Sequence, residues 1–211
     1  MKVFDFEQGT NEWKNIRKGI ITGTKAKDVF SCNNLKLVDF LISEVTSDFE
    51  ESDYESNSMI WGKSQEFQAR VEYELKTFNK VVQHGFCISE AHDFLGISPD
   101  GFIVDKNGNY VGGLEIKCLD GKNHCEFIRM NTIPAKYRQQ VNHYFIVNDK
   151  IEWVDFVSYE PRNKLIKLFV VRVKRVEIQD VLKENMDGFL KFRNKWLKYH
   201  KEFVDKSENA I

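Results

Sequence analysis

Two carboxylates and one lysine lie near the middle of the sequence, at a spacing that suits metal-ion chemistry. Asp100 belongs to a Pro-Asp-Gly turn, and Glu115 and Lys117 follow in the short run LEIKC, with fourteen residues between the two acids. Side chains alternate between the faces of a strand, so Glu115 and Lys117 share one face at a separation of about 7 Å. Leu114 and Ile116 share the other. Burying a carboxylate and an ammonium costs free energy, so their place inside an apolar run indicates a function.

The residues between Asp100 and Glu115 predict a hairpin. The run DKNGN contains an Asn-Gly pair, which readily adopts positive φ angles. If the chain folds back through residues 107–109, Asp100 comes opposite Glu115, with the Ile116 carbonyl beside them. Oxygen ligands of this kind suit Mg²⁺ or Mn²⁺, and Lys117 would orient a water molecule. The alternative is an ordinary turn and a solvated Glu–Lys pair, which would contribute little.

The hydrophobic pattern predicts the elements that must position these residues. Short apolar runs with turn residues between them predict a three-strand meander, and two more strands are expected within residues 151–176. Because sequential strands usually pair, we expect an α/β fold with one mixed sheet and helices on its faces. Helical spacing predicts four helices, over residues 35–45, 59–78, 134–147 and about 176–203.

Two helices carry further expectations. Thr24 is expected to cap a helix that starts near Lys25. An acidic, serine-rich loop is expected over residues 47–58, before the helix over 59–78. The buried side of that helix is expected to consist of Met59, Ile60, Phe67, Val71 and Leu75.

Composition limits the class of protein. With 211 residues, 42 % of them hydrophobic, the chain suits a single domain over residues 1–211 with a sizeable core. It has no apolar run of about 18 residues and no N-terminal signal segment, so no membrane association is expected and a cytoplasmic protein is the default. The four cysteines form no C-x-x-C pair, so neither zinc nor an iron–sulfur cluster is expected.

The net charge of −1 is the sum of two unlike halves. Residues 1–120 carry a net charge of −7, and residues 121–211 carry +6. A basic C-terminal half could face a polyanion such as a nucleic acid. The alternative is that the lysines cover solvated helix faces.

Longer stretches resemble a known family. The pattern Asp-x14-Glu-x-Lys resembles the signature of the PD-(D/E)XK nuclease superfamily. Over about residues 8–150, further stretches resemble, in order, blocks of its λ-exonuclease or YqaJ-like viral recombinase family. This resemblance implies a restriction-endonuclease-like core at about residues 58–160, with a central mixed sheet flanked by helices. The stretches are QGTNEWKNIRKGIITGTKAKDVF, WGKSQEFQARVEYE, GISPDGFI, LEIKC and PAKYRQQVNHYFIV.

The resemblance also implies roles at the predicted metal site. Asp100, Glu115 and the Ile116 carbonyl would be metal ligands, and Lys117 would position or activate the attacking water. Glu66, on the helix over residues 59–78, would be a further catalytic acid and a possible metal ligand. The alternative for Glu66 is an ion pair with the residue four positions later, Arg70.

Five other residues are implied to bind DNA. Arg17, Thr24 and Ser98 would form a pocket for a terminal 5′-phosphate, which an arginine fork suits chemically. Tyr137 and Gln140 match a Tyr-x-x-Gln element of the family and would lie near the scissile phosphate, although packing on a helix face is the alternative.

The implied function is a Mg²⁺-dependent exonuclease, with Mn²⁺ as a substitute. It would degrade linear double-stranded DNA from 5′-phosphorylated ends and leave 3′ single-stranded overhangs for phage-type recombination. Its partner would be a single-strand annealing protein, its assembly a homotrimeric ring, and its location the cytoplasm of a bacterial host of a phage or prophage. The alternatives are a structure- or sequence-specific endonuclease on the same fold, and a non-catalytic DNA-binding protein.

Overall fold

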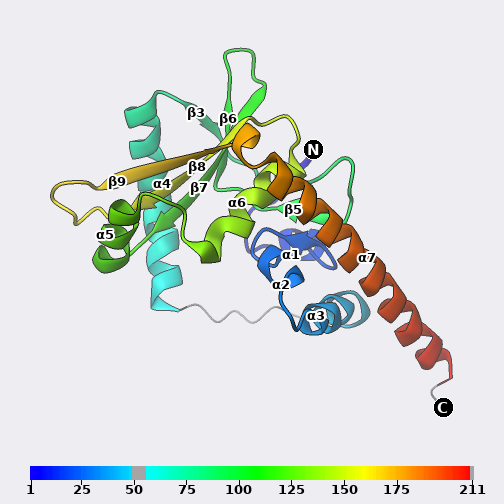
Figure 1. Ribbon diagram of the computed structural model, residues 1–211. Coiled ribbons are helices and arrows are strands. Elements are labelled where there is room, and N and C mark those ends of the chain that lie inside the picture. Colours follow the sequence, from blue (N-terminus) through cyan, green and yellow to red (C-terminus); the bar gives the residue numbers. More distant parts are fainter. Residues whose placement is uncertain (49–55, 210–211) are drawn as a thin grey trace.

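The computed structural model describes residues 1–48 and 56–209, in which the strands form two sheets (Figure 1). The larger sheet is mixed, as predicted, because β7 and β8 run parallel while its other neighbouring strands are antiparallel. Its strand order is β3 (Lys80–Val82), β6 (Gly101–Val104), β7 (Tyr110–Cys118), β8 (Trp153–Tyr159) and β9 (Leu168–Lys174).

The prediction of a single sheet is wrong. Part of the expected meander joins two N-terminal strands in a separate four-stranded sheet. Those two strands span only three and two residues, which is too short for a periodic pattern to be recognised. The order of this sheet is β1 (Lys2–Phe4), β4 (Phe86–Ile88), β5 (Leu95–Ile97) and β2 (Ile21–Thr22).

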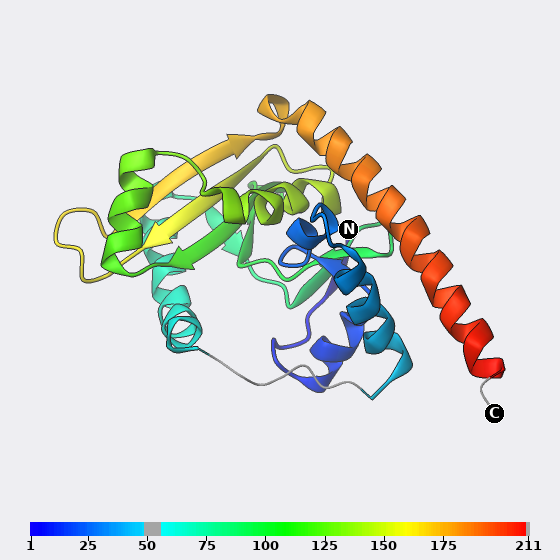
Figure 2. The same cartoon turned by 60° about the horizontal axis from the view of Figure 1, so that its bottom comes forward.

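Helices cover both faces of the five-stranded sheet (Figure 2). Helix α4 packs on one face, and α5 and α6 pack on the other. Helix α5 was not predicted; Asp120 caps it, since its carboxylate accepts a hydrogen bond from the amide of Asn123 at 2.9 Å. The α-helices are α1 (Asn11–Ile16), α2 (Ala26–Val29), α3 (Leu35–Thr46), α4 (Asn57–Thr77), α5 (Gly121–Met130), α6 (Ala135–Val147) and α7 (Gln179–Glu208).

The hairpin between β6 and β7 forms where the sequence predicted it. Gly108 has a φ angle of 84°, and the Asp105 carboxylate accepts hydrogen bonds from the amides of Asn107 and Asn109, each at 2.8 Å. The register pairs Gly101 with Leu114. Asp100, which precedes Gly101, therefore lies opposite Glu115, which follows Leu114.

Helix α6 lies between the two sheets and connects them. The Nε2 atom of His143 lies 3.1 Å from the Ile21 carbonyl oxygen and 3.0 Å from that of Gly96, both in the four-stranded sheet. The next residue, Tyr144, donates a hydrogen bond from its hydroxyl to the carbonyl of Leu114 in the five-stranded sheet, at 2.7 Å. Consecutive residues of one helix thus fix the position of each sheet.

The predicted buried face of the helix over residues 59–78 is wrong. Met59, Ile60, Phe67 and Leu75 are exposed, and Phe67 and Leu75 each retain 68 % of their accessible surface. The face against the sheet consists instead of Ala69, Arg70 and Tyr73. A polar anchor fixes this orientation, because the Tyr73 hydroxyl donates a hydrogen bond of 2.6 Å to the buried carboxylate of Asp155 on β8. Most of the predicted loop over residues 47–58 lies outside the described residues.

Helix α7 is longer than predicted and runs past the body of the protein (Figures 1 and 2). Its buried side chains repeat at intervals of three and four residues, and they lie in its first eighteen residues. No helix among the described residues is both long and apolar enough to span a bilayer. The buried side chains of α7 are Leu182, Asn185, Phe189, Phe192 and Trp196.

Candidate active site

The two faces of strand β7 carry different kinds of side chain. Leu114 and Ile116 belong to the apolar cluster that includes Ala69 and Tyr73 of α4. Glu115 and Lys117 therefore project from the opposite face, toward α5 and α6. This alternation is the one that the sequence predicted.

The β6–β7 hairpin brings Asp100 to the edge of β7. Its Oδ2 atom accepts a hydrogen bond from the backbone amide of Ile116 at 2.6 Å. Its own amide donates to the hydroxyl of Tyr144 at 3.1 Å. The N–H and C=O of one strand residue point to the same edge, so the Ile116 carbonyl faces the side on which Asp100 lies.

The carboxylate of Glu115 is fully buried and has few polar partners. The Nζ atom of Lys117 lies 2.5 Å from its Oε1. Within the described residues, neither carboxylate oxygen receives a hydrogen bond of good direction. A buried carboxylate in this condition is costly, since a lone ion pair seldom offsets the loss of hydration.

The close approach of these groups shifts their protonation. Burial raises the pKa of Asp100 well above its ordinary value, and the neighbouring Glu115 carboxylate raises that pKa further. Burial alone would lower the pKa of Lys117, but the carboxylates of Glu115 and Asp100 outweigh it and leave this pKa raised. Lys117 is therefore a cation, which suits it to bind a phosphate oxygen or orient a water molecule.

These oxygen atoms fit a hard divalent cation. Asp100, Glu115 and the Ile116 carbonyl supply only oxygen, which is the ligand type of Mg²⁺ and Mn²⁺, and the buried Glu115 carboxylate has Lys117 as its ion-pair partner. Within the described ranges, no group of three or more His, Cys, Asp or Glu side chains is arranged to hold a metal ion. Any cation here would therefore depend on the backbone carbonyl and on water as well.

Glu66 lies at the margin of this group. Its Oε1 is 3.2 Å from Nη1 of Arg70, so the ion pair weighed as an alternative does form. The Glu66 carboxylate still affects the site electrostatically. It raises the pKa of Asp100, although by less than burial and the Glu115 carboxylate do. The ion pair and a role at the site are thus compatible.

Tyr137 and Gln140 occupy two different parts of the site. The ring of Tyr137 packs on Phe156, and its centroid lies 5.4 Å from Nζ of Lys117. Gln140 lies one turn further along α6, against the backbone of Gly23, where an added Cβ would lie 3.3 Å from its side chain. Tyr137 therefore adjoins the carboxylates, whereas Gln140 adjoins the end of β2.

Thr24 and Ser98 follow the ends of two parallel strands. The register of β2 and β5 pairs Thr22 with Gly96, and Thr24 and Ser98 each follow two residues later. The Ser98 hydroxyl is buried without a hydrogen-bond partner in the described part of the chain. The prediction that Thr24 caps a helix is wrong, since the N-cap of the four-residue α2 is Lys25.

Arg17 and Thr24 line one open pocket of about 540 Å³. The Arg17 guanidinium carbon lies 3.7 Å above the ring of Trp13, which restricts its orientation. Lys25, Lys36 and Asp28 line the same pocket, and Lys25 is paired with Glu44 at 2.7 Å, so basic side chains outnumber acidic ones in its lining. An anion would suit it.

Two residues that support the site were not identified as functional from the sequence. Arg70 donates a hydrogen bond to the carbonyl of Asp100 at 2.9 Å, and Tyr144 bonds to both Asp100 and Leu114. Their spacing held a signal, because Arg70 is four residues after Glu66 and Tyr144 is seven after Tyr137, on the same helix faces.

Comparisons with known proteins agree with this geometry. A family model described as the YqaJ-like viral recombinase domain matches residues 12–150. A search of curated proteins found no match.

Three solved structures have similar folds. An alkaline exonuclease (LHK-Exo) from Laribacter hongkongensis is 24 % identical, with a TM-score of 0.85 and a match that covers 96 % of this chain and 100 % of that one. Its complex with dAMP gives 25 % identity, a TM-score of 0.84 and the same coverage. A phage related exonuclease from Haemophilus somnus 129PT is 13 % identical, with a TM-score of 0.51 and coverage of 98 % and 97 %. The expected fold class is confirmed.

Proposed function

Because the chain belongs to the family of YqaJ-like viral recombinase domains, we propose that it is a Mg²⁺-dependent exonuclease that degrades linear double-stranded DNA. The family and the similar fold of the alkaline exonuclease support a deoxyribonuclease. Degradation would proceed from 5′-phosphorylated ends and leave 3′ single-stranded overhangs.

The buried carboxylate of Glu115 is the observation that carries the proposal. Its oxygens lack directed hydrogen bonds in the described residues. Asp100 bonds to the amide of Ile116, the residue after Glu115 on the same strand, so the two carboxylates and the Ile116 carbonyl are close neighbours. These three groups would hold the cation, and Mn²⁺ would substitute for Mg²⁺. A bound Mg²⁺ supplies polarisation of the phosphate and a lowered pKa for the attacking water.

Lys117 and Tyr137 would act on the scissile phosphate. Lys117 would position or activate the attacking water and stabilise the negative charge of the transition state. The ring of Tyr137 lies next to that ammonium and would restrict where the DNA backbone can pass. Glu66 would remain a candidate third acid, held by Arg70.

The polarity of degradation would depend on the pocket near Arg17. Arg17 and Thr24 line it, Ser98 follows β5, the strand paired with β2, and Gln140 lies against Gly23, the residue before Thr24. A terminal phosphate bound by the Arg17 guanidinium would set the distance from the DNA end to the cleaved bond.

The wider biology follows from the family. We infer a single nuclease domain over residues 1–211, a ring-shaped homotrimer and a single-strand annealing partner, in the cytoplasm of a bacterial host of a phage or prophage. The net charge of +6 in residues 121–211 supports contact with DNA within such an assembly.

One assay tests this function. Linear duplex with 5′-phosphate or 5′-hydroxyl ends, and covalently closed circular DNA, are incubated with Mg²⁺, with a label on one end of one strand. Release of 5′-terminal nucleotides from phosphorylated linear DNA alone is expected, and Asp100→Asn should be inactive. Cutting of the closed circle would mean an endonuclease instead. Equal activity of wild type and Asp100→Asn would mean that the activity is not that of this site.

A further inference from the structure

The loop between β8 and β9, residues 160–167, leaves the sheet at the same end as Lys117. The parallel register pairs Lys117 with Ser158, after which β8 ends at Tyr159. Both ribbon views show the loop extending beyond the carboxyl ends of β7 and β8 (Figures 1 and 2). Leu165 is seven positions after Ser158, so the loop end lies at most about 25 Å from Ser158.

Several contacts hold the base of this loop. The buried Glu160 carboxylate accepts two hydrogen bonds from the Arg162 guanidinium, at 2.8 and 2.6 Å. That guanidinium lies 4.6 Å from the ring centroid of Trp61 on α4. On the other side, Nε2 of His124 on α5 lies 2.7 Å from the Ile166 carbonyl oxygen. The loop is therefore fixed to helices on both faces of the sheet.

Its end is also ordered internally. The Asn163 side-chain oxygen accepts hydrogen bonds from the amides of Leu165 and Ile166, each at 3.0 Å. A loop held in this way loses little conformational entropy when it binds a partner.

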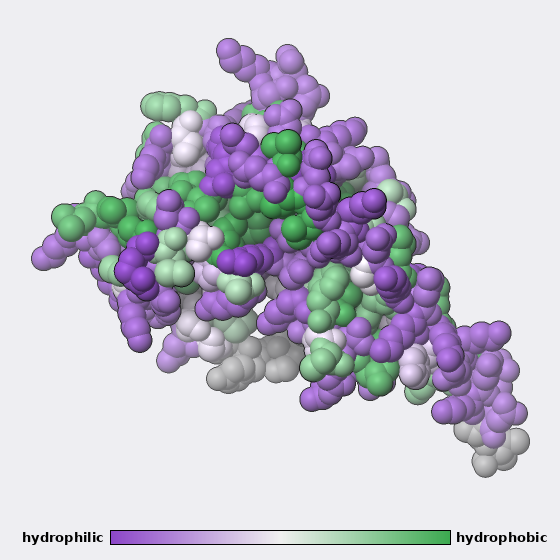
Figure 3. Space-filling view, in the orientation of Figure 1, coloured by the Kyte–Doolittle hydropathy of each residue, from purple (hydrophilic) through white to green (hydrophobic). Residues whose placement is uncertain are grey.

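The exposed end of the loop combines positive charge with an apolar side chain. Leu165 retains 93 % of its accessible surface. Lys164 and Lys167 are exposed and form no ion pair in the described ranges. Residues 161–176 contain six basic and no acidic side chains. Figure 3 shows hydrophobic surface at the end of this loop with hydrophilic surface next to it.

We propose that the loop over residues 160–167 binds the DNA substrate, which rests on the proposed function. Lys164 and Lys167 bind backbone phosphates of the duplex away from the cleaved bond, and Leu165 packs against sugars and base edges in a groove. A polyanion fits better than an apolar partner, because the lysine charges are not neutralised and counterion release favours their contact with phosphates. At 3.4 Å per base pair, a duplex with its end at Lys117 reaches the loop within about ten base pairs.

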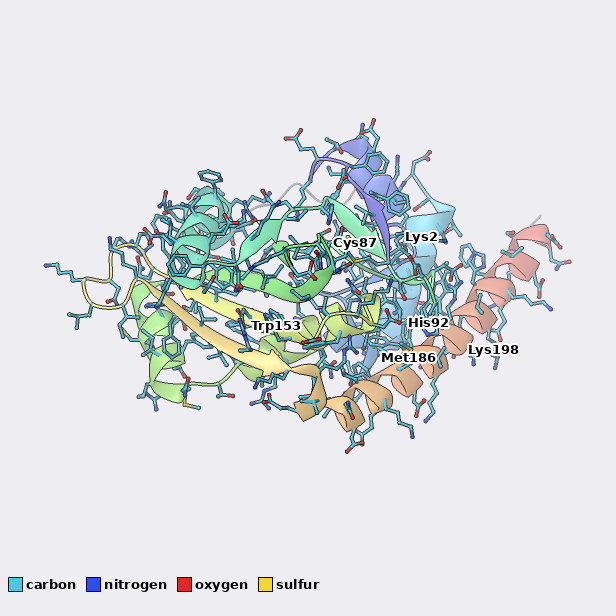
Figure 4. All side chains as sticks on the ribbon, turned by 90° about the horizontal axis from the view of Figure 1, so that it is seen from above. Lys2, Cys87, His92, Trp153, Met186 and Lys198 are labelled. Atoms are coloured by element: carbon cyan, nitrogen blue, oxygen red, sulfur yellow. The ribbon has the colours of Figure 1, made fainter. Side chains whose placement is uncertain are left out.

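The other end of the same sheet supplies a matched control. Lys106 is exposed in the turn between β6 and β7, at the opposite end of β7 from Lys117. Seen from above, the β8–β9 loop lies at one end of the molecule, whereas His92, Met186 and Lys198 lie toward the other (Figure 4). If only the net charge of the protein mattered, replacing Lys106 would weaken DNA binding as much as replacing Lys164 or Lys167.

The test measures binding separately from cleavage. The full chain is titrated into a fluorescent, 5′-phosphorylated duplex of about 20 base pairs in EDTA, at several salt concentrations. Lys164→Gln and Lys167→Gln should each weaken binding several-fold and reduce the salt slope by about 1, whereas Lys106→Gln should match wild type. Leu165→Ala should weaken binding several-fold without changing that slope.

The outcomes separate the two proposals. If wild type degrades phosphorylated linear DNA but Lys164→Gln and Lys167→Gln bind like Lys106→Gln, the loop has no role in DNA binding. If wild type neither binds nor degrades duplex DNA, the proposed function itself fails. If the loop variants change the mass of the protein in solution, the loop joins copies of the chain instead, and the inference is overturned.

Discussion

Arg70 on α4 donates a hydrogen bond from Nη1 to the backbone carbonyl of Asp100 at 2.9 Å, and the same nitrogen lies 3.2 Å from Oε1 of Glu66. One guanidinium therefore holds both the turn that carries Asp100 and the carboxylate that the family resemblance assigns to catalysis. Hydrogen bonds from a charged donor are among the stronger ones in proteins. Arg70 thus connects helix α4 to the turn that carries Asp100.

Replacing Arg70 by lysine should impair catalysis more than folding. A lysine keeps the charge but lacks the planar fork that reaches the Asp100 carbonyl and Glu66 together. Loss of a residue that orients metal ligands typically costs about 10–100-fold in activity or metal affinity. We expect such a fall in the rate of DNA degradation, with an unchanged circular dichroism spectrum. Arg129→Lys, at an exposed position on α5, is the control. Equal rates for the two variants would contradict the role of Arg70.

Removing the charge of Glu115 should abolish metal binding. The carboxylate is paired with Lys117 and is fully buried, so Glu115→Gln leaves that ammonium without this partner and should melt at a lower temperature than wild type in EDTA. Mg²⁺ should raise the melting temperature of wild type and leave that of the variant unchanged, because only wild type binds the ion. The variant should also lack nuclease activity. A Mg²⁺-dependent rise in Glu115→Gln, or unfolding of wild type by EDTA, would contradict this assignment.

The sequence predicted the centre of the site because its chemistry and its geometry are local. The Asn-Gly turn and the alternation along β7 place Asp100, Glu115 and Lys117 without any knowledge of distant contacts. The residues that hold the site in place were harder to predict. The hydrogen bonds from Tyr144 to Leu114 and from Arg70 to Asp100 each join residues that are 30 positions apart in the sequence. Those contacts depend on how each helix is rotated on the sheet, which periodicity alone does not fix.

Arg17→Gln should reduce the preference for phosphorylated ends. The guanidinium lies in a positively charged pocket, and its bidentate contact would be available only when a terminal phosphate is present. We expect kcat/KM on 5′-phosphorylated duplex to fall about 10–100-fold, which corresponds to the loss of one charged hydrogen-bonding group. The value for 5′-hydroxyl duplex should change little. Lys27→Gln, exposed on α2 and outside this pocket, should keep the wild-type preference. If both DNA ends lose activity equally, Arg17 does not recognise the phosphate.

His143 should make the protein less stable in acid. Burial lowers the pKa of its imidazole to about 4, whereas the unfolded chain has an ordinary pKa near 6.5. Between these values the unfolded state binds more protons, so stability falls as the pH drops from about 6.5 to about 4. His143→Gln lacks this titration, and its free energy of unfolding should fall less over that window, by roughly 3 kcal/mol. Urea unfolding at several pH values measures the difference. Parallel curves for the two proteins would contradict it.

The sequence pattern and the structure predict different buried faces for α4, and mutations distinguish them. The pattern predicts that Phe67 is buried, in which case Phe67→Ala would cost about 3–5 kcal/mol. In the structure Phe67 is exposed and Tyr73 faces the sheet with its hydroxyl on Asp155. Phe67→Ala should therefore change the free energy of unfolding by about 0.5 kcal/mol or less, whereas Tyr73→Phe should cost about 1–3 kcal/mol, because it leaves a buried carboxylate with one partner fewer. Urea unfolding of both variants decides the question, and a large loss in Phe67→Ala would mean that the apolar stripe of α4 is covered.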